Sequence, residues 1–175
     1  PLRINSLAFN GGEFGMSICP GKKGPSVRYG DYYWDRDLLT DVEAIREWGA
    51  CAIITLLEDY EFDELGLNRM AFNRAVVNNN MEWRHIRILD GGIPDERFDD
   101  IWYDVKTHTI DPILGTGGKV FVHCRGGLGR TGLVVAQYML EEGTGSPEEV
   151  MAMVRAARPG AIENSMQENY LEGFA

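Results

Sequence analysis

The residues that could carry out a reaction are concentrated in one stretch, Val122-His-Cys-Arg-Gly-Gly-Leu-Gly-Arg-Thr-Gly132. A helix N-terminus and a nearby guanidinium lower the pKa of a cysteine from about 8.5 to about 3.5–7.5, which produces a thiolate nucleophile. Five residues separate Cys124 from Arg130, enough for the backbone to curl around a tetrahedral anion. Arg130 can bind two phosphate oxygens at once, and Thr131 can donate its hydroxyl to the sulfur when the sulfur leaves. The spacing therefore predicts transfer of a phosphoryl group to Cys124.

The loop between the cysteine and Arg130 is predicted to bind the phosphate through its backbone. Its glycines permit the backbone angles that aim successive N–H groups at one anion. His123, directly before the cysteine, is expected to brace the loop by hydrogen bonds. The loop residues expected to bind the substrate phosphate together with Arg130 are Arg125, Gly126, Gly127, Leu128 and Gly129.

A carboxylic acid is the second requirement of this chemistry, because the leaving alkoxide or phenoxide needs a proton and the hydrolytic water then needs a base. Asp90 follows a predicted strand and precedes two glycines, so it is the candidate general acid. A simpler interpretation makes Asp90 an Asx-turn residue. Asp95 is the alternative acid, although its position after Pro94 also suits a helix N-cap. Glu58 and Asp59 follow another strand and are interpreted as solvated.

The same loop also fits the GxGxxG pattern of dinucleotide-binding loops, from Gly127 to Gly132. That pattern requires an acidic residue about 20 positions further on, at the end of a second strand. Ser146–Arg158 instead has the pattern of a helix that begins with a capping box. A Walker phosphate loop does not fit either, because Arg130 stands where its lysine would be. A buried structural cysteine beside a glycine-rich turn is the remaining non-catalytic alternative.

The loop must be positioned by strands that alternate with helices. The predicted strands are Ser6–Phe9, Gly15–Cys19, Cys51–Leu57, Glu82–Ile88 and Lys119–His123. Six helices are predicted. The first begins at a Thr40 capping box, the second spans Asp63–Asn78, and the third runs from Phe98 to Pro112 or to Gly115–Gly118. The fourth spans Leu133–Glu142, the fifth runs from Ser146 to Arg158, and the sixth begins near Asn164. This order predicts a single α/β domain over residues 1–175, with a mainly parallel central sheet flanked by helices on both faces. Ligands bind beyond the carboxyl ends of such strands, so the loops that follow the strands should meet along one edge.

The composition narrows the classes of partner. The chain has 175 residues, and 17 Lys and Arg against 27 Asp and Glu give a net charge of −10. This balance argues against nucleic acid and against an anionic membrane as partners, because both attract basic proteins. The longest apolar run, Ala50–Leu57, is too short to cross a membrane, and no signal-peptide core is found. The three cysteines lack a CxxC pair and the three histidines lack metal-ligand spacing, so we expect no metal, no cofactor and a cytoplasmic protein.

Three stretches of the sequence together resemble the cysteine-dependent protein tyrosine and dual-specificity phosphatases. They are Asp90-Gly-Gly-Ile-Pro-Asp95, His123–Thr131 and Gly160-Ala-Ile-Glu-Asn-Ser-Met-Gln-Glu-Asn-Tyr-Leu171. The sequence is most similar to the kinase-associated phosphatase branch, also called cyclin-dependent kinase inhibitor 3-like, in order and spacing over residues 15–174. One departure is Thr131-Gly132, where that branch often has Ser-Cys and the wider family frequently has Thr-Gly.

The resemblance implies that Cys124 is the nucleophile, Arg130 the phosphate-binding arginine and Asp90 the general acid on a mobile loop. It also places Gln167 near the site, where it would position water. The implied activity is hydrolysis of a phosphorylated protein through a phosphocysteine intermediate, with phosphotyrosine first and phosphoserine or phosphothreonine next. Arg125 is the one basic residue inside the loop, which disfavours inositol lipids. The alternatives are a phosphopeptide-binding module without turnover and a nucleotide-binding domain, and we expect a monomer.

Overall fold

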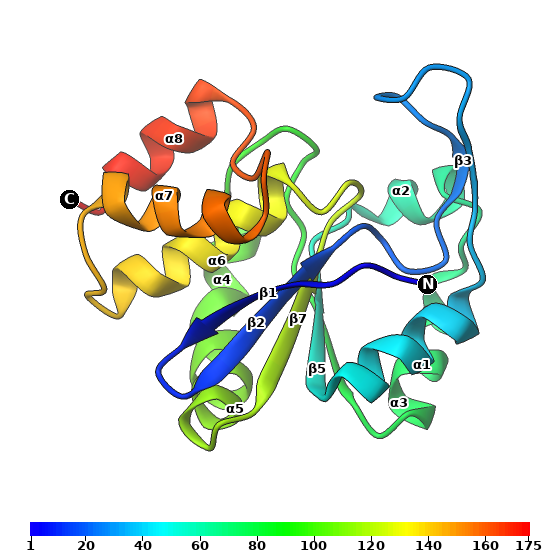
Figure 1. The fold of residues 1–175 in the computed structure, drawn as a ribbon, viewed down its shortest axis with the longest axis horizontal. Coiled ribbons are helices and arrows are strands. Elements are labelled where there is room, and N and C mark those ends of the chain that lie inside the picture. Colours follow the sequence, from blue (N-terminus) through cyan, green and yellow to red (C-terminus); the bar gives the residue numbers. More distant parts are fainter.

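The central sheet consists of five strands in the order β1-β2-β7-β5-β6 (Figure 1). The computed structural model describes residues 1–175. Strands β2, β7, β5 and β6 run parallel, and β1 pairs antiparallel with β2 at one edge. The strands are β1 (Asn5–Phe9), β2 (Gly12–Ser17), β5 (Ala50–Thr55), β6 (Glu82–His85) and β7 (Lys119–His123). The predicted α/β fold with a mainly parallel sheet is confirmed.

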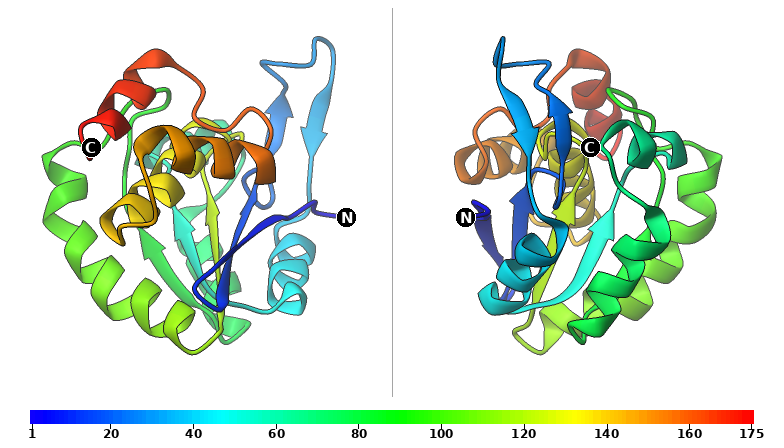
Figure 2. Two further views of the ribbon diagram at one scale, coloured as in Figure 1. Left: turned by 60° about the vertical axis from the view of Figure 1, so that its left-hand side comes forward. Right: turned by 90° about the vertical axis from the view of Figure 1, so that its right-hand side faces the viewer.

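Two hydrophobic cores lie on opposite faces of this sheet, and Figure 2 shows helices on both sides of it. In the central strand β7, Val120 and Val122 belong to the larger core and Phe121 belongs to the smaller, as the alternation of side chains along a strand requires. The smaller core is covered by α1 (Leu38–Trp48), α2 (Asp59–Glu64) and α3 (Arg69–Asn78). The larger core is covered by α4 (Glu96–Val105), the π-helical turn η1 (Lys106–Ile110), α5 (Asp111–Gly115), α6 (Gly129–Glu141), α7 (Pro147–Ala157) and α8 (Ser165–Glu172). Helices therefore flank both faces, as predicted.

The parallel strands end together at one edge of the sheet. Thr55, the last residue of β5, pairs with His85 at the end of β6 and with His123 at the end of β7. Backbone hydrogen bonds continue past these ends, from Ile86 N–H to Thr55 O and from Leu56 N–H to His123 O. The three loops that follow these strands therefore meet, as the sequence predicts.

Several helix boundaries differ from the predicted ones. Helix α1 begins at Leu38 rather than at a Thr40 capping box, because the Asp37 carboxylate is the N-cap and accepts the Thr40 N–H at 2.8 Å. The predicted helix Asp63–Asn78 is two helices, α2 and α3, separated at Gly66, whose φ is +67°. Pro112 does not end the helical run that begins with α4, because it lies in the first turn of α5, where no intrahelical N–H donor is needed. No helix is both long enough and apolar enough to span a membrane.

A small hairpin, which the sequence pattern does not predict, connects β2 to α1. It consists of β3 (Lys23–Pro25) and β4 (Tyr33–Asp35), with Gly24 opposite Trp34. The two strands form a sheet of their own, separate from the central one. Figure 1 shows the hairpin standing at the same end of the molecule as the loop that follows β7.

Candidate active site

The loop between β7 and α6 is pressed tightly against the neighbouring strand. Gly127 has a φ of +66°, and a Cβ at this position would lie 1.9 Å from the Ser17 carbonyl oxygen. Only glycine fits there, because both the backbone angle and the close approach exclude a side chain. Cys124 lies at the start of this loop and is 3% exposed. Helix α6 begins at Gly129, so its N-terminus faces the loop that the cysteine opens.

The carbonyl groups of the loop are held by residues from other elements. Arg158 donates from Nε to Gly127 O at 2.9 Å and from Nη2 to Gly126 O at 3.1 Å. The Cys19 N–H donates to Arg125 O at 3.3 Å. With the carbonyls bound from outside, the loop N–H groups are available to an anion. The sequence analysis missed Arg158, because no local pattern distinguishes this partly buried residue at the end of α7 from the other arginines of the chain.

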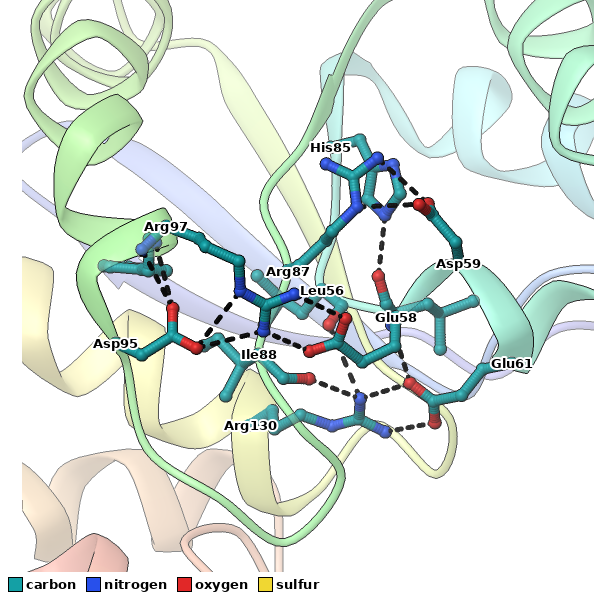
Figure 3. Close-up of polar contacts among 12 residues, drawn as sticks. Leu56, Glu58, Asp59, Glu61, His85, Arg87, Ile88, Asp95, Arg97 and Arg130 are labelled. Carbon is teal, nitrogen blue, oxygen red and sulfur yellow. Dashed lines mark hydrogen bonds and ion pairs between the residues drawn. The ribbon is translucent and has the colours of Figure 1, made fainter.

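Arg130 is fixed by a buried carboxylate. Its Nη1 and Nη2 atoms donate to the two oxygens of Glu61 at 2.6 and 2.8 Å, and Nη1 also donates to the Ile88 carbonyl at 2.9 Å (Figure 3). The Arg130 side chain is 1% exposed and that of Glu61 is 0% exposed. Burial lowers the pKa of Arg130, but the hydrogen bonds with Glu61 and the neighbouring anionic groups raise it more, so the guanidinium stays charged. The sequence analysis did not identify Glu61 as the partner of Arg130, because Glu61 is one of several acidic residues in the same segment.

Two buried polar atoms beside the loop lack a hydrogen-bond partner. They are Arg130 Nε and Thr131 Oγ1. An unsatisfied buried donor costs about 1–3 kcal/mol, so such atoms point to a ligand that completes them. A phosphate bound in the loop would accept from Arg130 Nε, and donation from the Thr131 hydroxyl to the sulfur stays a prediction.

His123 braces the loop, as predicted. Its Nδ1 lies 3.0 Å from Cys124 O and its Nε2 lies 2.7 Å from Thr55 Oγ1. The carbonyl accepts only from a protonated Nδ1, so Nε2 must accept from the Thr55 hydroxyl. Burial lowers the pKa of His123 from 6.5 to about 3, so the imidazole is neutral. It therefore acts as a structural brace and not as a proton donor.

The structure separates the two candidate acids. Asp90 lines the same pocket as Cys124, and its Oδ1 accepts from Arg130 Nη2 at 3.0 Å. Asp95 does not line the pocket. It is the N-cap of α4 and pairs with Arg97, and the hydrogen bonds from Arg97 hold the pKa of Asp95 below its usual value. The geometry therefore brings Asp90, and not Asp95, to the loop.

The segment that carries Asp90 is held from α8. Asn164 Nδ2 donates to Gly91 O at 2.8 Å, and Gln167 Nε2 donates to Gly92 O at 3.1 Å. The Gln167 amide oxygen also accepts the Glu163 N–H at 2.9 Å. Gln167 is fully buried. In this structure it positions the acid segment, and its role toward water stays a prediction.

One interpretation of the neighbouring carboxylates is wrong. Glu58 is not solvated: it is 6% exposed and accepts two hydrogen bonds from Arg97, one at 2.9 Å and one at 2.5 Å (Figure 3). The sequence could not reveal this, because Arg97 lies 39 positions away. Asp59 is exposed and pairs with Arg87. The structure brings together no group of three or more metal-ligating side chains.

The predicted residues open onto a pocket of about 930 Å³. Those that line it are Asp90, Cys124, Arg125, Gly126, Leu128 and Gly129. The other predicted residues are buried and do not line it: His123, Gly127, Arg130, Thr131 and Gln167. The arrangement can hold a tetrahedral anion against a thiol, with a carboxyl group at its side.

Comparisons with known proteins agree with this geometry. The chain matches the family model described as "Dual specificity phosphatase, catalytic domain" over residues 54–172. Cyclin-dependent kinase inhibitor 3 of Rattus norvegicus is 36% identical over 174 residues, which is 98% of this chain and 74% of that protein. Dual specificity protein phosphatase CDC14A of Homo sapiens is 40% identical over 107 residues, which is 61% of this chain and 17% of that protein. The chain spans about half or less of the first curated relatives that it matches, 51%, 17% and 11% of their lengths.

Solved structures show the same fold. The crystal structure of kinase associated phosphatase, with its catalytic site cysteine substituted by serine, has a TM-score of 0.81 and 27% identity. The match covers 99% of this chain and 94% of that one. The active form of Tk-PTP has a TM-score of 0.69 at 24% identity, over 97% of this chain and 95% of that one, and supports the fold alone. From the family match and the loop geometry, the chain belongs to the family of dual specificity phosphatase catalytic domains.

Proposed function

We propose that this protein hydrolyses phosphate monoesters on phosphorylated proteins through a phosphocysteine intermediate. The observation that carries the proposal is the meeting of three groups. Cys124 lines the pocket, Arg130 lies buried behind the loop with Nε unpartnered, and Asp90 lies 3.0 Å from Arg130. Phosphotyrosine is the first substrate to test, followed by phosphoserine and phosphothreonine. Cytoplasmic location and a monomeric state stay predictions.

In the first step, the Cys124 thiolate attacks phosphorus and the bond from phosphorus to the ester oxygen breaks. The loop N–H groups and Arg130 bind the oxygens of the phosphoryl group while charge shifts between them. Asp90 gives its proton to the departing oxygen, which leaves as a neutral alcohol or phenol. The products of this step are phosphocysteine and an ionised Asp90.

In the second step, water attacks the phosphocysteine. Asp90 takes a proton from this water, the bond from phosphorus to sulfur breaks, and inorganic phosphate leaves. The Thr131 hydroxyl donates to the sulfur as it regains its negative charge. The protein ends in the state in which it started, with a thiolate at Cys124 and a protonated Asp90.

The test is turnover of an aryl phosphate and of a phosphotyrosine peptide in the presence of excess chelator. We expect turnover to survive the chelator, to be blocked by vanadate and to fall to the background rate in Cys124→Ser, which should still bind phosphate. Loss of activity in chelator with recovery on adding Zn²⁺ or Mg²⁺ would contradict the mechanism. Binding of the phosphopeptide without any turnover by the wild type would favour the phosphopeptide-binding alternative.

A further inference from the structure

The mouth of the pocket carries a charge opposite to that of the chain as a whole. The chain has a net charge of −10, whereas the residues that line the pocket include six basic and two acidic ones. The basic ones are Arg3, Lys22, Arg28, Arg36, Arg125 and Arg158, and the acidic ones are Asp90 and Glu163. A cleft of one sign in a protein of the other sign concentrates ligands of opposite charge locally.

Three of these cations already have partners within the protein. Arg36 pairs with Asp41 at 2.7 Å and Arg125 pairs with Glu64 at 2.6 Å. Arg158 binds the carbonyls of the phosphate loop, as described above. The other three, Arg3, Lys22 and Arg28, form no ion pair with any carboxylate, so their charges are available to a ligand, and two of them, Lys22 and Arg28, belong to the hairpin region.

The hairpin β3–β4 places these two cations over the pocket. Lys22 lies directly before β3, and its Nζ is 3.5 Å from Arg125 O, at the lip of the phosphate loop. Arg28 lies in the segment between β3 and β4, and its guanidinium extends toward the segment that follows α7. Its Nη1 would be 3.9 Å from a Cβ at Gly160, which follows α7. The two cations therefore flank the entrance above Cys124.

A third donor comes from the hairpin itself. Trp34, on β4, lines the pocket, and its Nε1 is buried without a hydrogen-bond partner. The Lys22 ammonium lies 5.0 Å from the centre of the Trp34 ring. Burial also lowers the pKa of Lys22, so the protein holds this ammonium at a cost that a bound anion would offset. An ammonium, a guanidinium and an indole N–H make a donor set suited to a carboxylate or a phosphate.

We propose that Lys22, Arg28 and Trp34 Nε1 form a second anion site, which selects phosphopeptides with an anionic side chain next to the hydrolysed phosphoresidue. This inference rests on the proposed function and specifies its substrate. The volume of about 930 Å³ is in the range that holds a whole small ligand rather than one phosphorylated side chain. Apolar and aromatic side chains at the hairpin tip suit a peptide, since Val27 is 93% and Tyr29 is 64% exposed. The net charge of −10 opposes approach to an anionic membrane.

The experiment compares kcat/KM for three substrates: an aryl phosphate, a phosphotyrosine peptide flanked by glutamine, and the same peptide flanked by glutamate. It uses the wild type, Arg28→Gln, Arg28→Lys and the control Arg74→Gln, which removes an exposed arginine of α3 that has no ion pair. We expect the wild type and the control to prefer the glutamate-flanked peptide by about tenfold, with the preference falling as salt rises. Arg28→Gln should lose most of this preference through a higher KM, Arg28→Lys should keep part of it, and the aryl phosphate should not distinguish the four proteins.

Equal kcat/KM for the two peptides, or a preference that Arg28→Gln leaves intact, would overturn this inference while aryl phosphate turnover leaves the proposed function standing. Absence of aryl phosphate turnover would instead overturn the proposed function. A fourth substrate, vesicles that contain a phosphoinositide, tests the other source of a second phosphate. Faster hydrolysis of these vesicles than of the glutamate-flanked peptide, with loss in Arg28→Gln, would assign the anion site to a lipid headgroup and contradict the peptide proposal.

Discussion

The two walls of the pocket are built in different ways. The inner wall is the loop Cys124–Gly129 with Arg130 behind it, where Arg130 is 1% exposed and bound by the fully buried Glu61. The outer wall is the hairpin β3–β4, whose tip exposes Val27 to 93%. The inner wall has its positions fixed by many buried hydrogen bonds, whereas the outer wall makes few contacts with the rest of the protein. Bond making requires one fixed geometry, and a surface that selects among peptides does not.

The largest expected effect concerns the proposed acid, Asp90, which lines the pocket and contacts Arg130 of the inner wall. Asp90→Asn should lower kcat/KM, which reports the first step, by about 10²–10⁴ for substrates with poor leaving groups, because these need the proton. The loss in kcat/KM should be small for an activated aryl phosphate. Rates measured across a series of leaving-group pKa values test this. Asp95→Asn is the control, because Asp95 caps α4 away from the pocket. A steep leaving-group dependence in Asp95→Asn, with wild-type behaviour in Asp90→Asn, would reverse the assignment.

The next effect tests how firmly the inner wall must hold Arg130. Glu61 is the buried partner of Arg130, and Glu61→Gln removes its charge while keeping the shape of the side chain. We expect kcat/KM to fall by about 10², because the Arg130 guanidinium loses its fixed orientation. The matched control is Glu64→Gln in the same helix, whose carboxylate pairs with Arg125 at the surface. The control should change the rate by less than about threefold. Similar losses in both variants would show that burial of the pair does not matter, and circular dichroism checks that each variant is folded.

A smaller effect is expected where Arg158, the residue after the end of α7, supports the inner wall. Arg158→Gln removes the donors to Gly126 O and Gly127 O and should lower kcat/KM by about tenfold, because the loop N–H groups are then held less firmly. Arg74→Gln, an exposed arginine on α3, is the control. Since Arg158 acts through the loop, the affinity for vanadate should fall together with the rate. An unchanged vanadate affinity would show that the loop keeps its shape without Arg158.

The smallest expected effect concerns the pH dependence of stability. Burial lowers the pKa of His85 from 6.5 to about 4, so the unfolded chain binds this proton at a higher pH than the folded chain does. The contribution of the neutral His85 to the free energy of unfolding is fully present above pH 6.5 and is lost as the pH falls toward 4. Between pH 7.5 and pH 5.5 the free energy of unfolding should decrease by about 1 kcal/mol for each such histidine. Urea unfolding of the wild type and of His85→Gln at both pH values measures it, and an equal decrease in both proteins would contradict the assignment.

The sequence predicts the inner wall far better than the outer one. The loop and its supporting strand and helix lie within one continuous segment, and their glycines and apolar runs have local physical causes. Asp90 could be placed because the predicted strand Glu82–Ile88 ends close before it, although β6 itself ends at His85. Glu61 and Arg158 could not be identified, since each acts on a residue distant in the sequence and nothing near either marks it. The order of strands and helices was predictable from the same local patterns.

The hairpin shows why the remainder was not predictable. Its strands are three residues each, and glycines and prolines around them have the pattern of an ordinary loop. Lys22 and Arg28 are placed by single contacts with residues distant in the sequence, Arg125 for Lys22 and the Gly160 region for Arg28, which no local pattern encodes. The burial of Glu58 could not be predicted for the same reason, because its partner Arg97 lies on α4, which is distant in the sequence.

The most direct test of the central claim is to trap the covalent intermediate. The protein is mixed with an activated aryl phosphate, quenched in acid within one turnover and digested for mass spectrometry. Asp90→Asn should accumulate more intermediate than the wild type, because the second step lacks its base while the first step hardly needs an acid. The account predicts a phosphoryl group on the peptide that contains Cys124, and none in Cys124→Ser. Turnover without phosphorylation of Cys124, or a phosphoryl group on another residue, would contradict it.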